Sequence, residues 1–141
     1  MKTILNRVQK FKSFVYQSVQ WSESEGELAL VVEIVARAHS DPICSGCGCR
    51  APGYDRLATR LFEFVPLWGI PVLFFYARLR VNCKRCGVKV EAVPWAQGKH
   101  TLTTAHMQFL ATWAKRLSWQ EVAAIFRTSW EQVFRSVERA V

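Results

Sequence analysis

The sequence predicts an α+β fold in which β-strands and a paired-cysteine module come first and a helical unit follows. Three observations predict this order. Two Cys-x-x-Cys-Gly motifs occupy 44–48 and 83–87. Apolar residues alternate in the manner of β-strands through most of the chain before residue 98. From Thr103 onward the apolar period becomes that of a helix. We therefore divide the chain into a region 1–98 and a region 99–141.

The beginning of the first region is expected to contain one short helix and a β-hairpin. Apolar residues at helical spacing predict an amphipathic helix over 3–12. Alternation predicts a strand over 14–21 and a second strand over 28–38. The polar, glycine-containing segment 22–27 between them is typical of a turn. These signals together predict a hairpin.

The rest of the first region is expected to contain three further strands. They are predicted over 57–65, 71–82 and 88–93, and the segment 97–100 is the predicted linker to the second region. Alternation over 71–82 places apolar and basic residues on one face of a single strand. The residues of that face include Phe74, Tyr76, Arg78 and Arg80. We expect the N-terminal helix to cover the two aromatic side chains.

The two cysteine pairs predict a metal site. Cys44, Cys47, Cys83 and Cys86 have the spacing with which four thiolates close a tetrahedron around one ion, as in a zinc ribbon. Four thiolates leave no open coordination position, so we expect one structural zinc ion. The glycine after each pair allows the positive φ that such a turn often needs. Cys49 is the spare cysteine, expected to be an idle thiol. Iron in a rubredoxin-like electron carrier is the alternative.

Charge and composition indicate a polyanionic partner. The net charge is +8 and the isoelectric point is about 9.6, with nine basic and three acidic residues between 44 and 100. This balance favours nucleic acid or an acidic membrane surface. The sequence shows no secretory signal, and its longest apolar stretch, 65–77, is interrupted by proline and glycine. We expect a soluble, cytoplasmic protein that does not span a membrane and keeps its cysteines reduced.

The second region predicts a helix-turn-helix unit. A first helix carries His106, Leu110, Trp113 and Leu117 along one stripe, where the histidine is expected to be a core residue. Ser118-Trp-Gln-Glu and Ser129-Trp-Glu-Gln then form two capping boxes, eleven residues apart. Two helix starts this close leave room for one short helix, a tight turn and a third helix. A simple three-helix packing unit with a solvated polar face is the alternative.

Candidate DNA contacts lie on the third helix, in the turn before it and around the second cysteine pair. A helical projection places Trp130 among the packing residues and puts Gln132, Arg135 and Arg139 on the opposite side, facing a major groove. Arg127 occupies a turn position where glycine is common. The full set of candidate contacts is Arg78, Arg80, Lys84, Arg85, Arg127, Ser129, Gln132, Arg135 and Arg139. No catalytic nucleophile, phosphate-binding loop or pair of catalytic carboxylates is evident.

The order of these motifs resembles the N-terminal region of insertion-sequence transposases of the ISL-three family. The resemblance covers nearly the whole chain and is carried by segments 44–48, 53–57, 64–72, 80–87, 93–96, 114–123 and 129–137. It implies that a zinc ribbon and a helix-turn-helix bind the terminal inverted repeats of a transposon as double-stranded DNA. In that family a downstream RNase-H-like domain with an Asp-Asp-Glu triad cuts and joins the DNA.

That downstream domain is missing from this chain, so we expect residues 1–141 not to form an enzyme by themselves. Two other functions remain open from the sequence. In the first, the chain represses transposition by occupying the transposon ends without cutting them. In the second it only tethers other proteins. A homodimer formed through the full-length protein is left open as well.

Overall fold

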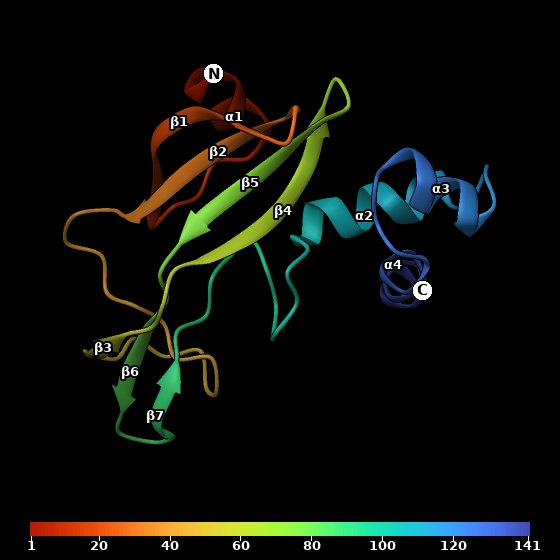
Figure 1. Cartoon of the computed structure of the whole chain (residues 1–141). Helices are drawn as coiled ribbons and strands as arrows, with labels where there is room; N and C mark the ends of the chain where they lie inside the picture. Colours follow the sequence, from red (N-terminus) through yellow and green to blue (C-terminus); the bar gives the residue numbers. More distant parts are fainter.

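The computed structural model contains four helices and two β-sheets, so the predicted α+β class is confirmed (Figure 1). The first sheet has the strand order β1-β2-β5-β4, and the second has the order β3-β6-β7. In chain order the elements are α1 (Lys2–Val8), β1 (Phe14–Ser24), β2 (Glu27–Ala36), β3 (Gly53–Arg56), β4 (Arg60–Leu67), β5 (Ile70–Tyr76), β6 (Leu79–Cys83), β7 (Gly87–Val90), α2 (Thr104–Trp113), α3 (Trp119–Ile125) and α4 (Trp130–Ala140).

Two tight hairpins build the first sheet. β1 and β2 pair antiparallel and turn at Glu25 and Gly26, both with positive φ, as predicted for the segment 22–27. β4 and β5 also pair antiparallel and turn at Trp68 and Gly69, again both with positive φ. Positive φ at both central residues is the turn geometry that matches the twist of paired strands. Parallel pairing of β2 with β5 joins the two hairpins into one sheet.

The core of the first sheet is a cluster of fifteen buried residues, rich in aromatic rings. Trp95 lies at its centre, 1% exposed, with edge-to-face contacts to Phe14 and Tyr76. Phe74 stacks on Phe64. Phe74 and Tyr76 are therefore covered as expected, but the rings that contact them include those of Phe14 and Phe11, which follow α1 rather than belong to it.

The N-terminal helix is shorter than predicted. It ends at Val8, and Gln9 is already extended, with φ −149° and ψ 104°. The carbonyl of Gln9 accepts a hydrogen bond from the Tyr16 hydroxyl at 2.5 Å, which ties the end of the helix to β1. Because the chain leaves the helix here, Phe11 turns into the core. The tertiary contact therefore overrides the helical periodicity of 3–12.

The strand predicted over 71–82 is two strands in different sheets. β5 ends at Tyr76 and β6 starts at Leu79, so the single basic and aromatic face expected from alternation does not exist. Before the break Phe74 is buried, and after it Val81 is buried, which shows that the inward-facing parity has changed. The structure also corrects the prediction over 57–65, because β4 starts at Arg60 and the short strand β3 had not been expected.

The second sheet and the two cysteine pairs form a separate small layer at one end of the first sheet (Figure 1). We call residues 43–56 and 79–91 the cysteine unit. The predicted strand 88–93 is β7 and ends at Val90. The next residue, Glu91, pairs instead with Cys44 in an isolated bridge. This pairing brings the first cysteine pair against the end of β7.

The three C-terminal helices, with residues 102–140, form the helical unit. Its core consists of Leu102, Met107, Leu110, Val122 and Val133. α2 starts beside the edge strand β4 and carries α3 and α4 at its far end (Figure 1). Two backbone hydrogen bonds attach the start of the unit to β4: Glu63 N–H donates to Thr101 at 2.8 Å, and Glu63 C=O accepts from Thr103 at 2.9 Å. None of the four helices has both the length and the apolar composition needed to cross a bilayer.

Candidate metal centre and nucleic-acid interface

The four predicted ligands converge. The sulfur atoms of Cys44, Cys47, Cys83 and Cys86 all lie within 4.8 Å of one another, close enough to hold a metal ion. Cys44 and Cys83 are buried, and the other two are half-buried. The spare residue, Cys49, is exposed and lies outside this group, although its carbonyl accepts from the Cys44 amide at 2.8 Å. The predicted ligand set therefore matches the geometry.

Glycines shape both cysteine turns. Gly48 and Gly87, each following the second cysteine of a pair, have φ of 74° and 76°, the left-handed conformation expected at these positions. Gly46 has a different role, because its amide donates to the Cys44 sulfur at 3.3 Å. A Cβ at Gly46 would lie 2.9 Å from the sulfur of Cys86. A side chain at this position would require the Cys86 sulfur to shift.

The close thiols affect one another's protonation. The backbone N–H groups of Arg85 and Cys86 lower the pKa of Cys83 to about 7. The hydrogen bond with the Cys47 thiol, together with burial, raises the pKa of Cys86 to about 12. Four close thiols thus share protons among themselves rather than ionise independently. A cation bound between them would replace those protons and stabilise the thiolates.

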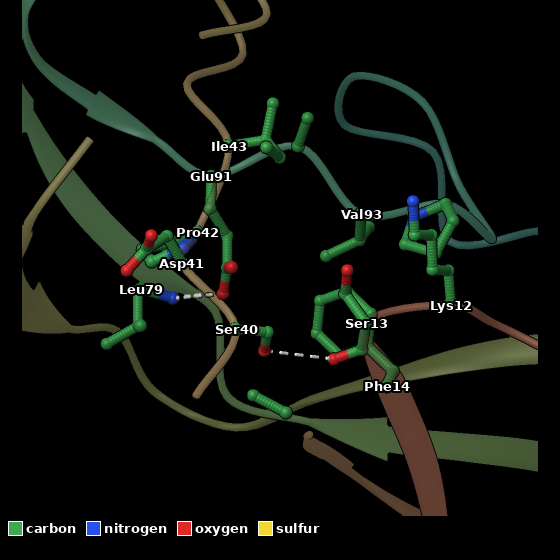
Figure 2. A pocket seen from close by; sticks show the side chains of 13 residues that line it. Lys12, Ser13, Phe14, Ser40, Asp41, Pro42, Ile43, Leu79, Glu91 and Val93 are labelled. Carbon is green, nitrogen blue, oxygen red and sulfur yellow. Dashed lines mark hydrogen bonds between the residues drawn. The ribbon is translucent and has the colours of Figure 1, made fainter. Parts of the chain in front are cut away.

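Glu91 connects the cysteine unit to the first sheet, and sequence reasoning had given it no role. It is 2% exposed and accepts hydrogen bonds from the Leu79 amide at 2.8 Å and from the Tyr76 hydroxyl. Figure 2 shows its carboxylate directed at Leu79, near Pro42, in a hollow of about 310 Å³ that Ile43 also lines. Burial, followed by the hydrogen bond to Glu91, raises the pKa of Tyr76. The sequence signal was a single acidic residue at the end of an apolar strand.

The basic residues predicted around the second cysteine pair have different surroundings. Lys84 and Arg85 are exposed in the turn between β6 and β7. The Arg80 Nε lies 2.6 Å from an oxygen of Asp55, and its guanidinium lies over the Tyr54 ring. Arg78 donates to the carbonyl of Gly98 at 3.2 Å. Arg78 and Arg80 are thus engaged within the molecule, whereas Lys84 and Arg85 present free charges to solvent.

The start of α3 has the predicted reciprocal cap, and the start of α4 has half of it. Ser118 Oγ accepts from the Glu121 amide, and the Glu121 carboxylate accepts from the Ser118 amide. Ser129 Oγ accepts from the Gln132 amide, but the Gln132 side chain does not return a bond. Arg127, in the turn between the two helices, has φ 52° and pairs with Glu27 on β2 at 3.3 Å. It therefore occupies a left-handed position that costs a non-glycine residue about 1–2 kcal/mol.

The packed face of α4 differs from the predicted one. Val133 and Ser136 are buried, and the Ser136 hydroxyl donates to the Gln132 carbonyl at 2.6 Å. α4 packs against α2. Trp130 is consequently not a buried anchor. It is 48% exposed and stacks on Phe134, and Trp119 of α3 contacts both rings.

The polar side of α4 carries the predicted contact residues. Arg135 and Arg139 are exposed and form no ion pair, and Gln132 is half-buried. His106 of α2 is a core residue, as expected, stacked on Phe109 with an unpaired Nδ1. Burial lowers the pKa of His106 to about 4.

Most of the chain is similar in sequence to curated transposases. Two relatives, from two strains of Mycobacterium tuberculosis, carry the name transposase for insertion sequence element IS1557. Each is 31% identical to this chain over an alignment of length 144 that covers 91% of the chain and 32% of the relative. The chain is related to transposases.

This transposase-related chain spans about a third of the length of those curated relatives. No protein-family model matches it, and no solved structure is similar to it. The similarity extends over both the cysteine unit and the helical unit, since it covers 91% of the chain. The similarity therefore includes at least part of each unit.

Proposed function

We propose that this chain is the DNA-binding region of a transposase of the ISL-three family and that it recognises terminal inverted repeats as double-stranded DNA. The observation that carries the proposal is the similarity to transposases along a chain whose basic charge surrounds a four-cysteine site. Phosphate contacts dominate DNA affinity, and free lysine and arginine side chains beside a rigid module supply them.

We assign the metal as one structural zinc ion. Four thiolates from two turns form a closed tetrahedral set, which leaves no position for water or substrate. Such an ion contributes folding free energy rather than chemistry, and it would fix the turn that carries Lys84 and Arg85. We accordingly assign no cleavage chemistry to residues 1–141, and strand transfer would belong to another part of the transposase.

In this proposal α3, the turn at Arg127 and α4 act as a helix-turn-helix. The second helix of such a motif lies in the major groove with its polar side toward the bases. Arg135 and Arg139 on the exposed side of α4 are then placed for base-edge or phosphate contacts, with Gln132 beside them. Ser129 caps the helix start that would approach the DNA backbone. Arg80 supports the scaffold through its contact with Asp55.

The test measures binding to duplex DNA carrying the terminal repeat of the element that encodes the chain, by fluorescence anisotropy at several salt concentrations. Arg135→Ala should lose about 1–3 kcal/mol on the cognate repeat and less on scrambled DNA, because it removes a base contact. Lys84→Ala should weaken binding to both and lower the salt slope by about one. Lys10→Ala, on the segment after α1, is the charge-matched control. Equal affinity of wild type and both variants for cognate and scrambled DNA would refute the assignment.

A further inference from the structure

A hollow between the cysteine unit and the first sheet gathers positive charge. Its volume is about 600 Å³, within the range of small-molecule and cofactor pockets. The start of β4, the break between β5 and β6, the segment after β7 and the loop before α2 all line it. The residues on its wall that carry cationic, amide or hydroxyl groups are Arg60, Arg78, Lys99, Gln97 and Ser45.

Two arginines are held in place on the wall of this hollow. The guanidinium carbons of Arg60 and Arg78 lie 5.4 and 5.3 Å from the centroid of the Phe62 ring. Each guanidinium also donates to a carbonyl of the loop before α2, Arg60 to Lys99 and Arg78 to Gly98. Neither arginine forms an ion pair with a carboxylate. Because each guanidinium has five N–H donors, most of them stay available to a ligand.

The charges in the hollow are not balanced. Arg60, Arg78 and Lys99 contribute three positive charges, and Glu91 is the one acidic residue on the wall. The Glu91 carboxylate already accepts from Tyr76 and Leu79. Burial lowers the pKa of Arg78, and the charge of Arg60 lowers it further, while Glu91 acts in the opposite direction. The two guanidinium groups repel each other in a partly buried place, and a bound anion would reduce that repulsion.

We propose that this hollow binds a phosphate group. Guanidinium donors in fixed positions, with a flexible ammonium beside them, are the chemistry that recognises phosphate oxygens. The phosphate has two sources, a DNA backbone and free phosphate in solution. The DNA source rests on the proposed function. In that case the contact lies between the cysteine unit and the loop leading to the helical unit, so it would anchor DNA between them.

The first arm of the test uses inorganic phosphate alone. Titration into ¹⁵N-labelled protein, followed by amide chemical shifts, should give a saturable shift at Gln97 and Ser45. Lys99→Gln and Arg60→Gln should each weaken this binding about tenfold, the loss expected for one charge-assisted hydrogen bond. Lys10→Gln should have no effect. Lys99→Gln is the decisive variant, because it keeps the carbonyl that Arg60 contacts and changes only an exposed side chain.

The second arm measures the salt dependence of duplex DNA binding by the same variants. If the ligand is a backbone phosphate, Lys99→Gln lowers the slope by about one relative to Lys10→Gln. A tenfold loss for inorganic phosphate with an unchanged DNA slope supports the site and identifies free phosphate as its ligand. Wild-type protein that binds phosphate but no DNA overturns the proposed function and leaves this site standing. No phosphate-induced shift together with an unchanged DNA slope overturns the site.

Discussion

Removing the metal should unfold the cysteine unit and leave the first sheet folded. The two parts have very different cores. The buried cluster of the cysteine unit consists of Cys44, Cys83, Ala51 and Val81, so it contains one large aliphatic side chain. Full burial of a valine is worth about 1.5–3 kcal/mol. A structural zinc site is worth about 10–16 kcal/mol in small zinc-binding peptides. The ion therefore outweighs the apolar contribution severalfold in this unit, whereas the first sheet has fifteen buried residues of its own.

Amide hydrogen exchange followed by mass spectrometry resolves the two parts. After chelation, peptides covering 43–50 and 81–90 should exchange within the shortest labelling time. Peptides covering 30–36 and 70–76 should keep their protection, because their strands pair with each other and with the aromatic core. Cys86→Ser should reproduce the effect without chelator, since three thiolates bind the ion less firmly than four.

Cys49→Ser is the matched control, because that thiol is exposed and outside the cluster. It should leave both the exchange pattern and the metal content unchanged. The reasoning is refuted if metal analysis shows complete removal of the ion while 43–50 and 81–90 remain protected. Elemental analysis of the same sample identifies the ion, and a red, iron-containing protein would exclude zinc.

Substitutions at three further sites test individual features. In the cysteine turn, Gly46→Ala should lower metal affinity by at least about tenfold in isothermal titration, because its Cβ would meet the Cys86 sulfur at 2.9 Å. Gly48→Ala has open space around its Cβ but a φ of 74°, so in thermal melts it should cost about 1 kcal/mol of stability while metal affinity is unchanged. In urea denaturation, the free energy of unfolding of Arg127→Gly should lie within about 1 kcal/mol of the wild-type value. That of Arg127→Val should be about 2 kcal/mol lower, because a branched side chain tolerates φ 52° poorly. Burial lowers the pKa of His106 to about 4, below the 6.5 of the free side chain, so the folded state favours the neutral imidazole. The contribution of His106 to the free energy of unfolding is therefore complete above pH 6.5 and is lost as the pH falls toward 4. The loss of stability amounts to as much as about 3 kcal/mol. Urea denaturation at pH 7 and pH 4.5 measures it, and this part of the difference between the two pH values should be absent in His106→Phe.

The features that the sequence predicted correctly depend on short separations along the chain. The cysteine pairs, the glycines that follow them and the serine cap at Ser118 each act within three or four residues, so the local pattern specifies the local geometry. Convergence of the two pairs was predictable as well, because a metal site needs all four sulfurs together. The hairpin turning at Gly26 followed from turn chemistry in the same way.

The features that were missed depend on partners distant in the sequence. Unbroken alternation over 71–82 gave no sign of the break after Tyr76, which arises because the residues on either side belong to different cores. The same holds for α4. A helical projection places Phe134 on the apolar side, but Phe134 is 40% exposed while Ser136 is buried, and Trp130 is left in an exposed aromatic group. Periodicity identifies an apolar face but not which of its residues the neighbouring helix covers.

The attachments between the first sheet and the helical unit limit how these two parts can move relative to each other. The start of the helical unit is paired with β4 through the backbone of Glu63, and the loop before it is bound by Arg60 and Arg78. The backbone hydrogen bonds of Glu63 do not depend on salt concentration. The exposed Arg127–Glu27 ion pair, in contrast, is worth about 0–1 kcal/mol and is screened by salt. Salt should therefore loosen the far end of the helical unit before its start. If both units contact DNA as proposed, the distance between their contacts is set by the pairing at Glu63 rather than by a flexible tether.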